Sequence, residues 1–91
     1  MADCQINCIN LSNSGRNHEH ITHVGNGRSW RITREDAIHR IKAGIDTFYV
    51  VDIYGRRANV GVVDASPPYL RTYADGVWTD NLLAQTTCQL Y

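Results

Sequence analysis

A single helix signature lies in this sequence among short segments that favour β-strands, and it constrains the fold more than any other feature. The signature begins at Thr33, whose hydroxyl can accept a hydrogen bond from a free amide of the first turn, and ends at Gly44, which suits a left-handed cap. The apolar stripe expected on its buried side consists of Ala37, Ile38, Ile41 and Ile45. A helix this short is stable only when it packs on a sheet.

The other segments predict short strands connected by tight turns. Strands are expected at residues 5–11, 20–24, 29–32, 47–53, 58–63, 69–73 and 77–78. A single helical turn is expected at 81–83, and the tail from Ala84 is weakly specified. Because short turns join most strands, we predict an α+β fold, a mainly antiparallel, strongly twisted sheet with one short helix packed on it. A partly closed barrel is the alternative.

The length of 91 residues predicts one domain that spans 1–91, because two domains would each be too small to bury a core. The sequence opens without an apolar signal-peptide region and contains no apolar run of the roughly 20 residues that cross a bilayer. We therefore expect a cytoplasmic protein without membrane contact, in which Cys4, Cys8 and Cys88 are reduced. The odd number of cysteines also argues against a closed disulfide framework.

The charged residues predict local rather than bulk attraction to anions. The formal net charge is zero, which argues against a general affinity for nucleic acid or anionic membranes. Of the 9 lysine and arginine residues, however, only Lys42 is a lysine. Arginine binds phosphate or carboxylate through two parallel hydrogen bonds and stacks on flat rings better than lysine does.

Two clusters and one isolated arginine are the candidates for ligand binding. The candidate residues are Arg28, Trp30, Arg31, Tyr54, Arg56, Arg57 and Arg71. The first three lie between a glycine turn and the start of the helix, where free backbone amides and arginine side chains could bind an anion. The alternative is an ordinary hairpin turn without a ligand. The next three lie on a predicted hairpin tip, which could contact a phosphate or simply keep an edge solvated. Arg71 is expected to face solvent and to pair with Asp75 or Asp80, with ligand contact as the alternative.

Three histidines suggest a metal site, but their spacing does not favour one. On a strand, His18 and His20 share a face and His23 points to the opposite face. No CxxC pair accompanies them, and Cys4 and Cys8 are poorly spaced for one strand face. The sequence also lacks a spaced set of nucleophile, base and acid, and a phosphate-loop signature. We therefore predict no metal, no cofactor, no catalytic residue and no enzymatic activity.

Several short motifs follow one another along the chain. They are Cys8-Ile9-Asn10, residues 20–25, Ile41-Lys42-Ala43-Gly44, Phe48-Tyr49-Val50, Tyr69-Leu70-Arg71-Thr72, Ala74-Asp75-Gly76 and Asp80-Asn81-Leu82-Leu83, closed by Cys88. In these motifs the chain resembles a small bacterial family, number 3892 in the domain-of-unknown-function series, over residues 6–88. Members of that family usually have Leu-Pro before the final cysteine, whereas this chain has Thr86-Thr87, so its last turn is expected to differ. The resemblance implies the extent of the domain. It implies nothing about activity, because none is assigned to the family.

The function expected from these residues is that of a non-enzymatic cytoplasmic binding module. Its expected ligand is an anionic small molecule such as a nucleotide, or the acidic surface of a protein partner. Self-association through an edge strand, giving a homo-oligomer, would enlarge a pocket. The alternative is a nucleic-acid-binding domain that uses the arginine-rich hairpin tips, against which the zero net charge argues. A small hydrolase has the weakest case.

Overall fold

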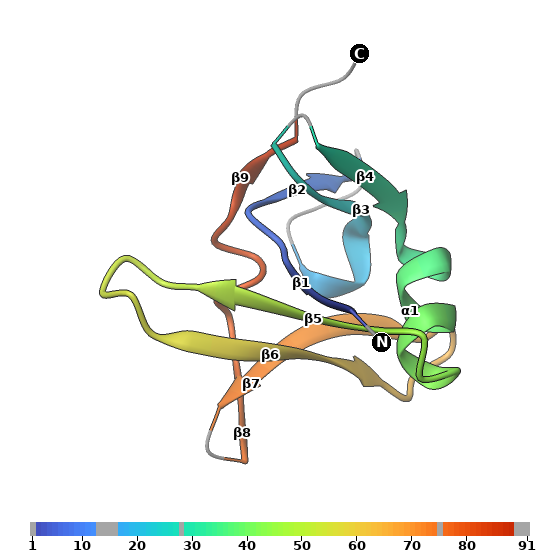
Figure 1. Ribbon diagram of the computed structural model, residues 1–91. Helices are drawn as coiled ribbons and strands as arrows, with labels where there is room; N and C mark the ends of the chain where they lie inside the picture. Colours follow the sequence, from blue (N-terminus) through green and yellow to red (C-terminus); the bar gives the residue numbers. More distant parts are fainter. Residues whose placement is uncertain (1, 13–16, 28, 75, 89–91) are drawn as a thin grey trace.

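Two sheets and one helix make up the computed structural model, which describes residues 2–12, 17–27, 29–74 and 76–88 (Figure 1). The five-stranded sheet has the order β1-β5-β6-β7-β8, with β1 at Ala2–Gln5, β5 at Asp46–Val51, β6 at Arg57–Val63, β7 at Tyr69–Ala74 and β8 at Val77–Thr79. The four-stranded sheet has the order β4-β3-β2-β9, with β4 at Trp30–Thr33, β3 at Ile21–Asn26, β2 at Cys8–Leu11 and β9 at Thr86–Thr87. Helix α1 spans Arg34–Lys42, and a short 3-10 helix, η1, spans His18–His20.

The predicted α+β class is confirmed, with one difference in its arrangement. The β1–β5 and β2–β9 pairs are parallel, and the other strand pairs are antiparallel. Instead of one twisted sheet, the strands form two, and across the described residues they do not close into a barrel. The segment predicted as one strand at 5–11 is divided between β1 in the first sheet and β2 in the second.

The division occurs at Ile6 and Asn7, where the backbone passes from one sheet to the other. The amide of Ile6 donates to the carbonyl of Tyr49 at 2.8 Å, and the amide of Asn7 donates to the carbonyl of Gly25 at 2.9 Å. The Ile6 side chain is fully buried in the core. That core contains Ile6, Ile9, Ile21, Val24, Ala37, Ile38, Phe48, Val50, Ala58, Val60, Leu70 and Leu82. One crossing segment therefore anchors both sheets to a common core.

Helix α1 follows the sequence signature closely. The Thr33 hydroxyl accepts a hydrogen bond from the Asp36 amide at 3.1 Å, and Gly44 has a φ of 69°, so both predicted ends are confirmed. In the apolar stripe Ala37 and Ile38 are buried and Ile41 is partly buried, but the prediction is wrong for Ile45, which is 46% exposed. Ile45 follows the left-handed glycine, which turns the chain away from the helix before this side chain can join the stripe.

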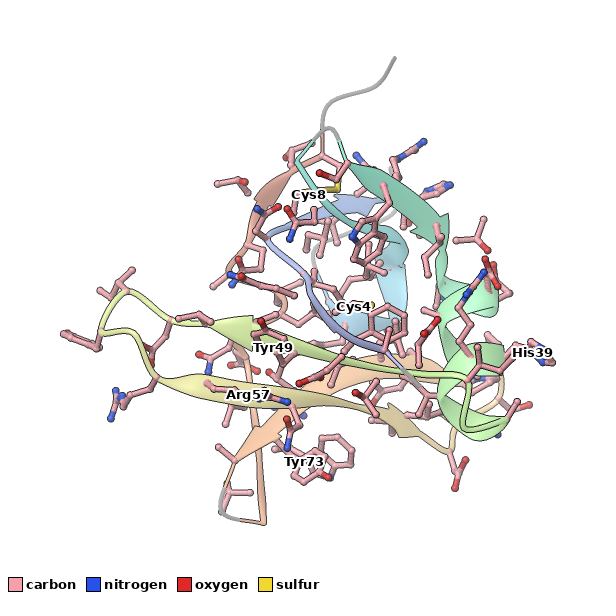
Figure 2. All side chains as sticks on the ribbon, viewed as in Figure 1. Cys4, Cys8, His39, Tyr49, Arg57 and Tyr73 are labelled. Atoms are coloured by element: carbon pink, nitrogen blue, oxygen red, sulfur yellow. A yellow bond between two sulfur atoms is a disulfide. The ribbon has the colours of Figure 1, made fainter. Side chains whose placement is uncertain are left out.

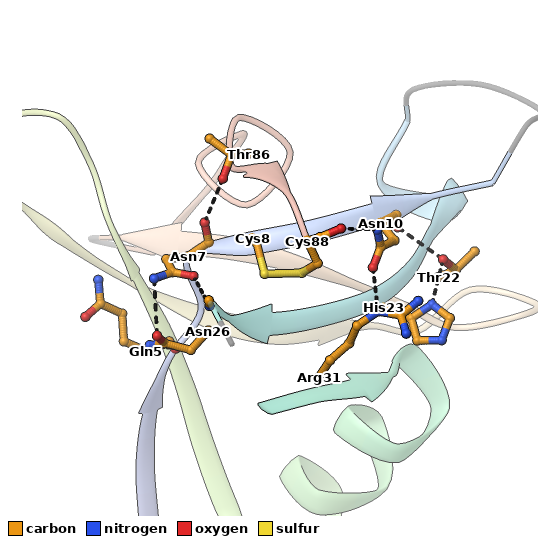
Figure 3. The surroundings of a disulfide bond; sticks show 11 residues. Gln5, Asn7, Cys8, Asn10, Thr22, His23, Asn26, Arg31, Thr86 and Cys88 are labelled. Atoms are coloured by element: carbon orange, nitrogen blue, oxygen red, sulfur yellow. Dashed lines mark hydrogen bonds between the residues drawn. A yellow bond between two sulfur atoms is a disulfide. The ribbon is translucent and has the colours of Figure 1, made fainter. Parts of the chain in front are cut away.

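A disulfide joins Cys8 and Cys88, so the prediction of three reduced cysteines is wrong for these two (Figure 3). They are 80 residues apart in sequence, and their Cα atoms lie 4.7 Å apart. The parallel pairing of β2 with β9 brings them together: the Cys88 amide donates to the Ile9 carbonyl at 3.0 Å, and the Asn10 side chain donates to the Cys88 carbonyl at 3.1 Å. The number of cysteines gave no sign of this pairing, because it depends on a strand contact between the two ends of the chain. Cys4 is a free, partly buried thiol.

Candidate ligand-binding site

A notch opens where two hairpins of the five-stranded sheet diverge. Strand β6 pairs with β7 only from Asn59, opposite Tyr73, to Val63, opposite Tyr69. Beyond Asn59, β6 continues alongside β5 alone and β7 continues alongside β8 alone, so the β5–β6 and β7–β8 hairpins separate (Figure 1). A pocket of about 560 Å³ lies between them. Its charged and polar lining residues are Asp52, Arg56, Arg57, Asn59, Thr79 and Asn81, and Tyr73 also lines it.

Arg57 lines the notch, and its guanidinium is held by a ring on β5 and a carboxylate on β1, on the side of β6 away from β7. Its guanidinium carbon lies 4.1 Å from the centre of the Tyr49 ring, and Nη2 lies 2.7 Å from Oδ2 of Asp3. In Figure 2, Arg57 lies between Tyr49 and Tyr73. A hydrogen bond from the Thr47 hydroxyl and, to a smaller extent, the Arg57 guanidinium lower the pKa of Asp3. Arg57 is thus preoriented, yet remains exposed.

Asp52 organises the tip that carries Arg56. One of its oxygens accepts hydrogen bonds from the amides of Tyr54 and Arg56, both at 2.9 Å, and the other accepts from Nε of Arg56 at 3.2 Å. These bonds, led by that of the Arg56 amide, lower the pKa of Asp52. The Arg56 guanidinium also lies over the Tyr54 ring, 5.2 Å from its centre. Two arginines and one aspartate therefore line the notch, and each arginine pairs with a carboxylate, Arg56 with Asp52 and Arg57 with Asp3.

A second pocket, of about 510 Å³, adjoins the first and shares Asp52, Arg56 and Asn81 with it. Ile53 and Tyr54 contribute from the hairpin tip, and the segment before β9 supplies the opposite wall. The predicted residues Tyr54, Arg56 and Arg57 are therefore brought together around one hairpin. Sequence reasoning missed Tyr73 and Asn59, although the alternation of Tyr73 with buried Thr72 could have placed Tyr73 on the face away from the core.

Most of the chain matches a known protein family. The sequence pattern of the family described as protein of unknown function (DUF3892) matches residues 5–84. The chain belongs to the DUF3892 family. The expected resemblance is confirmed, and the match includes every residue that lines the notch but ends before β9 and Cys88. No match was found among curated proteins or among solved structures.

The other predicted residues of this DUF3892 protein lie elsewhere. Trp30 and Arg31 belong to β4, in the other sheet: the Trp30 ring packs on Phe48 with centroids 5.8 Å apart, and Nε of Arg31 donates to Oδ1 of Asn10 at 2.7 Å. Arg28 lies outside the described residues. Arg71 pairs with Asp80 at 2.9 Å, as predicted, and also donates to the Thr79 carbonyl at 3.1 Å. Trp30, Arg31 and Arg71 are therefore not among the lining residues of the notch, although Arg71 contacts Thr79, which is one of them.

The three histidines do not share a strand. The strand predicted at 20–24 is present as β3 but begins at Ile21, because His18–His20 form η1, while His23 is on β3. His20 contacts the Ser12 hydroxyl at 3.2 Å and His23 contacts the Thr22 hydroxyl at 3.0 Å. Within the described ranges, no three His, Cys, Asp or Glu side chains come together as a metal ion would require. In the same ranges no helix is both long and apolar enough to cross a membrane.

His18 gives a prediction about pH. Its buried Nε2 has no hydrogen-bond partner among the residues that the structure describes, and it lies 3.7 Å from Oδ1 of Asp80. Burial and the Arg71 charge lower the pKa of His18 below 6.5, although Asp80 opposes them. The unfolded chain therefore binds this proton more readily than the folded protein does. We expect the free energy of unfolding to fall as the pH drops through 6.5 toward the lower pKa of the folded state.

Urea unfolding of the wild type and of His18→Gln between pH 5 and 8 checks this expectation. His23, whose pKa burial also lowers, is present in both proteins, so the difference between the two curves isolates His18. The wild type should lose more stability toward low pH than the variant. Parallel curves for the two proteins would contradict the expectation.

Proposed function

We propose that this DUF3892 protein is a non-enzymatic binding module whose notch holds an anionic small molecule such as a nucleotide. The observation that supports this most is the position of Arg56 and Arg57 in the lining of one pocket of about 560 Å³. Ligand pockets commonly have volumes of roughly 300–1,000 Å³. Phosphate oxygens are strong acceptors for guanidinium groups, which bind them through paired, charge-assisted hydrogen bonds.

The contacts that now hold the two arginines leave them available to a ligand. Arg56 and Arg57 are exposed and pair with Asp52 and Asp3. Exposed ion pairs of this kind contribute only about 0–1 kcal/mol, so a multiply charged phosphate can compete for the same hydrogen bonds. Asn59, Thr79 and Asn81 supply further polar side chains around the ligand.

We also propose a cytoplasmic location, as expected from the sequence. Disulfides are rare in the cytosol, so the Cys8–Cys88 bond is the observation that weighs against this location. The number of reactive thiols in denatured protein taken from its own host tests this proposal. Three thiols support the cytoplasm, whereas a single thiol, that of Cys4, would indicate an oxidising compartment.

The binding proposal is tested with tripolyphosphate and ATP in thermal unfolding and isothermal titration. Both ligands should raise the Tm of the wild type, because a ligand that binds only the native state stabilises it. Arg56→Gln combined with Arg57→Gln should weaken binding roughly 10- to 100-fold, as the loss of charge-assisted hydrogen bonds implies. Arg31→Gln is the matched control, since Arg31 is also an exposed arginine but lies on the other sheet.

The outcomes separate two positions for the site. Binding that survives in Arg31→Gln and is lost in the double variant supports the notch. Binding lost only in Arg31→Gln would move the site to β4, in the other sheet. A wild type that neither phosphate compound stabilises would contradict the proposed function.

A further inference from the structure

Exposed aromatic rings lie beside the arginines of the notch. In the strand register Tyr49 pairs with Asn59, Asn59 with Tyr73, and Tyr73 with Trp78. Directly paired residues point to the same face of a sheet, so these four side chains form one row across β5, β6, β7 and β8. The residues that alternate with them, Val50, Ala58, Val60, Leu70 and Thr72, are buried in the core. The row is therefore on the outer face.

Tyr73 and Trp78 form a ring pair on that face. Their centroids are 5.6 Å apart and their planes meet at 69°, an edge-to-face contact. Beneath the pair lies Gly61: a Cβ atom at this position would be 3.2 Å from Cε1 of Tyr73 and 3.4 Å from Cη2 of Trp78. The missing side chain lets both rings pack down onto the backbone of β6. Tyr73 remains 40% exposed and Trp78 44% exposed, so the pair still presents aromatic surface to solvent.

Tyr73 belongs both to this ring pair and to the lining of the notch. Tyr73 therefore lines the notch together with Arg56 and Arg57, while its ring packs over Gly61 beside Trp78, just outside that lining. A flat heteroaromatic ring gains by stacking on tyrosine or tryptophan, and a phosphate gains from arginine. An inorganic phosphate or an aliphatic carboxylate would bind the arginines but would not stack on the aromatic ring. A nucleotide carries both groups in one molecule.

We propose that the notch recognises a nucleotide unit, with its base stacked on the Tyr73–Trp78 pair and its phosphate bound by Arg56 and Arg57. This assignment rests on the proposed function and specifies its ligand. The unit is either a free nucleotide or one residue of a single-stranded nucleic acid, because the two present the same base and phosphate. Gly61 is the residue that makes room for the ring pair.

The first test compares ATP with tripolyphosphate, which has the same phosphate chain but no base. Stacking on an aromatic side chain strengthens binding by about 5- to 150-fold per base, so ATP should bind the wild type at least several-fold more tightly. Tyr73→Ala should bring the ratio of ATP affinity to tripolyphosphate affinity close to one, and Tyr73→Phe should retain the wild-type ratio. Tyr69→Ala, at the far end of β7 and outside the lining of the notch, is the matched control.

Fluorescence gives a second readout that does not depend on a truncated ring. The chain has 2 tryptophans, so Trp30→Phe leaves Trp78 as the only one. ATP should quench Trp78 in this variant, and tripolyphosphate should not. Binding of both compounds with equal affinity and without quenching would overturn the base-stacking assignment while the proposed anion site stands. If neither compound binds, both proposals fall.

A single-stranded hexanucleotide identifies the source of the unit. Tighter binding than ATP, with an affinity that falls steeply between 50 and 200 mM salt, would assign the site to a nucleic-acid strand. An affinity no better than that of ATP would assign it to a free nucleotide. In both cases Tyr73→Ala should weaken binding, and binding unaffected by this substitution would overturn the assignment.

Discussion

Replacing Cys88 with serine will lower the free energy of unfolding by about 3–5 kcal/mol under oxidising conditions. The disulfide links residues that are 80 apart in sequence, so its loss releases a long loop in the unfolded chain. In the folded protein it also leaves β9 attached to β2 through a short parallel pairing. Urea unfolding of the two proteins measures the difference, and the same loss should follow when a reductant is added to the wild type.

Cys4→Ser is the control for this prediction. Cys4 is the free cysteine among the described residues, so its replacement should change the free energy of unfolding far less. Addition of reductant should destabilise Cys4→Ser as much as the wild type and leave Cys88→Ser unchanged. A wild type indifferent to reductant would contradict the prediction, and it would show that the bond does not contribute to stability.

Truncating Leu82 to alanine will destabilise the protein by roughly 2–5 kcal/mol, the range for large-to-small changes in a core. Leu82 is fully buried, and its amide donates to the Thr72 hydroxyl at 3.3 Å. Thr72 is itself buried and bonded to the Thr79 hydroxyl at 2.8 Å. The side chain therefore anchors the turn between β8 and β9 to the centre of the five-stranded sheet, and its loss leaves a cavity there.

Leu83→Ala is the matched comparison, because this neighbouring leucine is only partly buried. Urea unfolding should show a clearly smaller loss for Leu83→Ala than for Leu82→Ala. Equal losses would mean that the turn docks through both leucines rather than through Leu82. A loss below about 0.5 kcal/mol for Leu82→Ala, the level of surface positions, would contradict its place in the core.

The elements that the sequence predicts well are those governed by local contacts. Thr33 and Gly44 end the helix through bonds and backbone angles within one turn, and the hairpin strands follow from their own turn residues. The break at Ile6 and Asn7 has no local signal, because it is produced by hydrogen bonds to Tyr49 and Gly25. Strand β9 likewise depends on β2, which lies at the opposite end of the chain.

The candidate site shows the same contrast. Arg56 and Arg57 could be chosen from the sequence because a turn with two arginines is exposed in almost any fold. Their neighbours Tyr73 and Asp3 could not, since the first depends on where β6 and β7 part and the second on the parallel pairing of β1 with β5. Trp30 and Arg31 are close to the helix start in sequence but belong to the other sheet. A register between strands decides which predicted residues become neighbours.

The point where β6 separates from β7 also divides this sheet into a paired region that contributes to the core and two diverging hairpin ends. Val60, Leu70 and Thr72 lie in the paired region and belong to the interior, whereas the ends of the two hairpins extend beyond it. Substitutions at those ends should therefore leave the interior intact. If the proposed notch binds a ligand, its hairpin ends can change what is bound with little loss of stability.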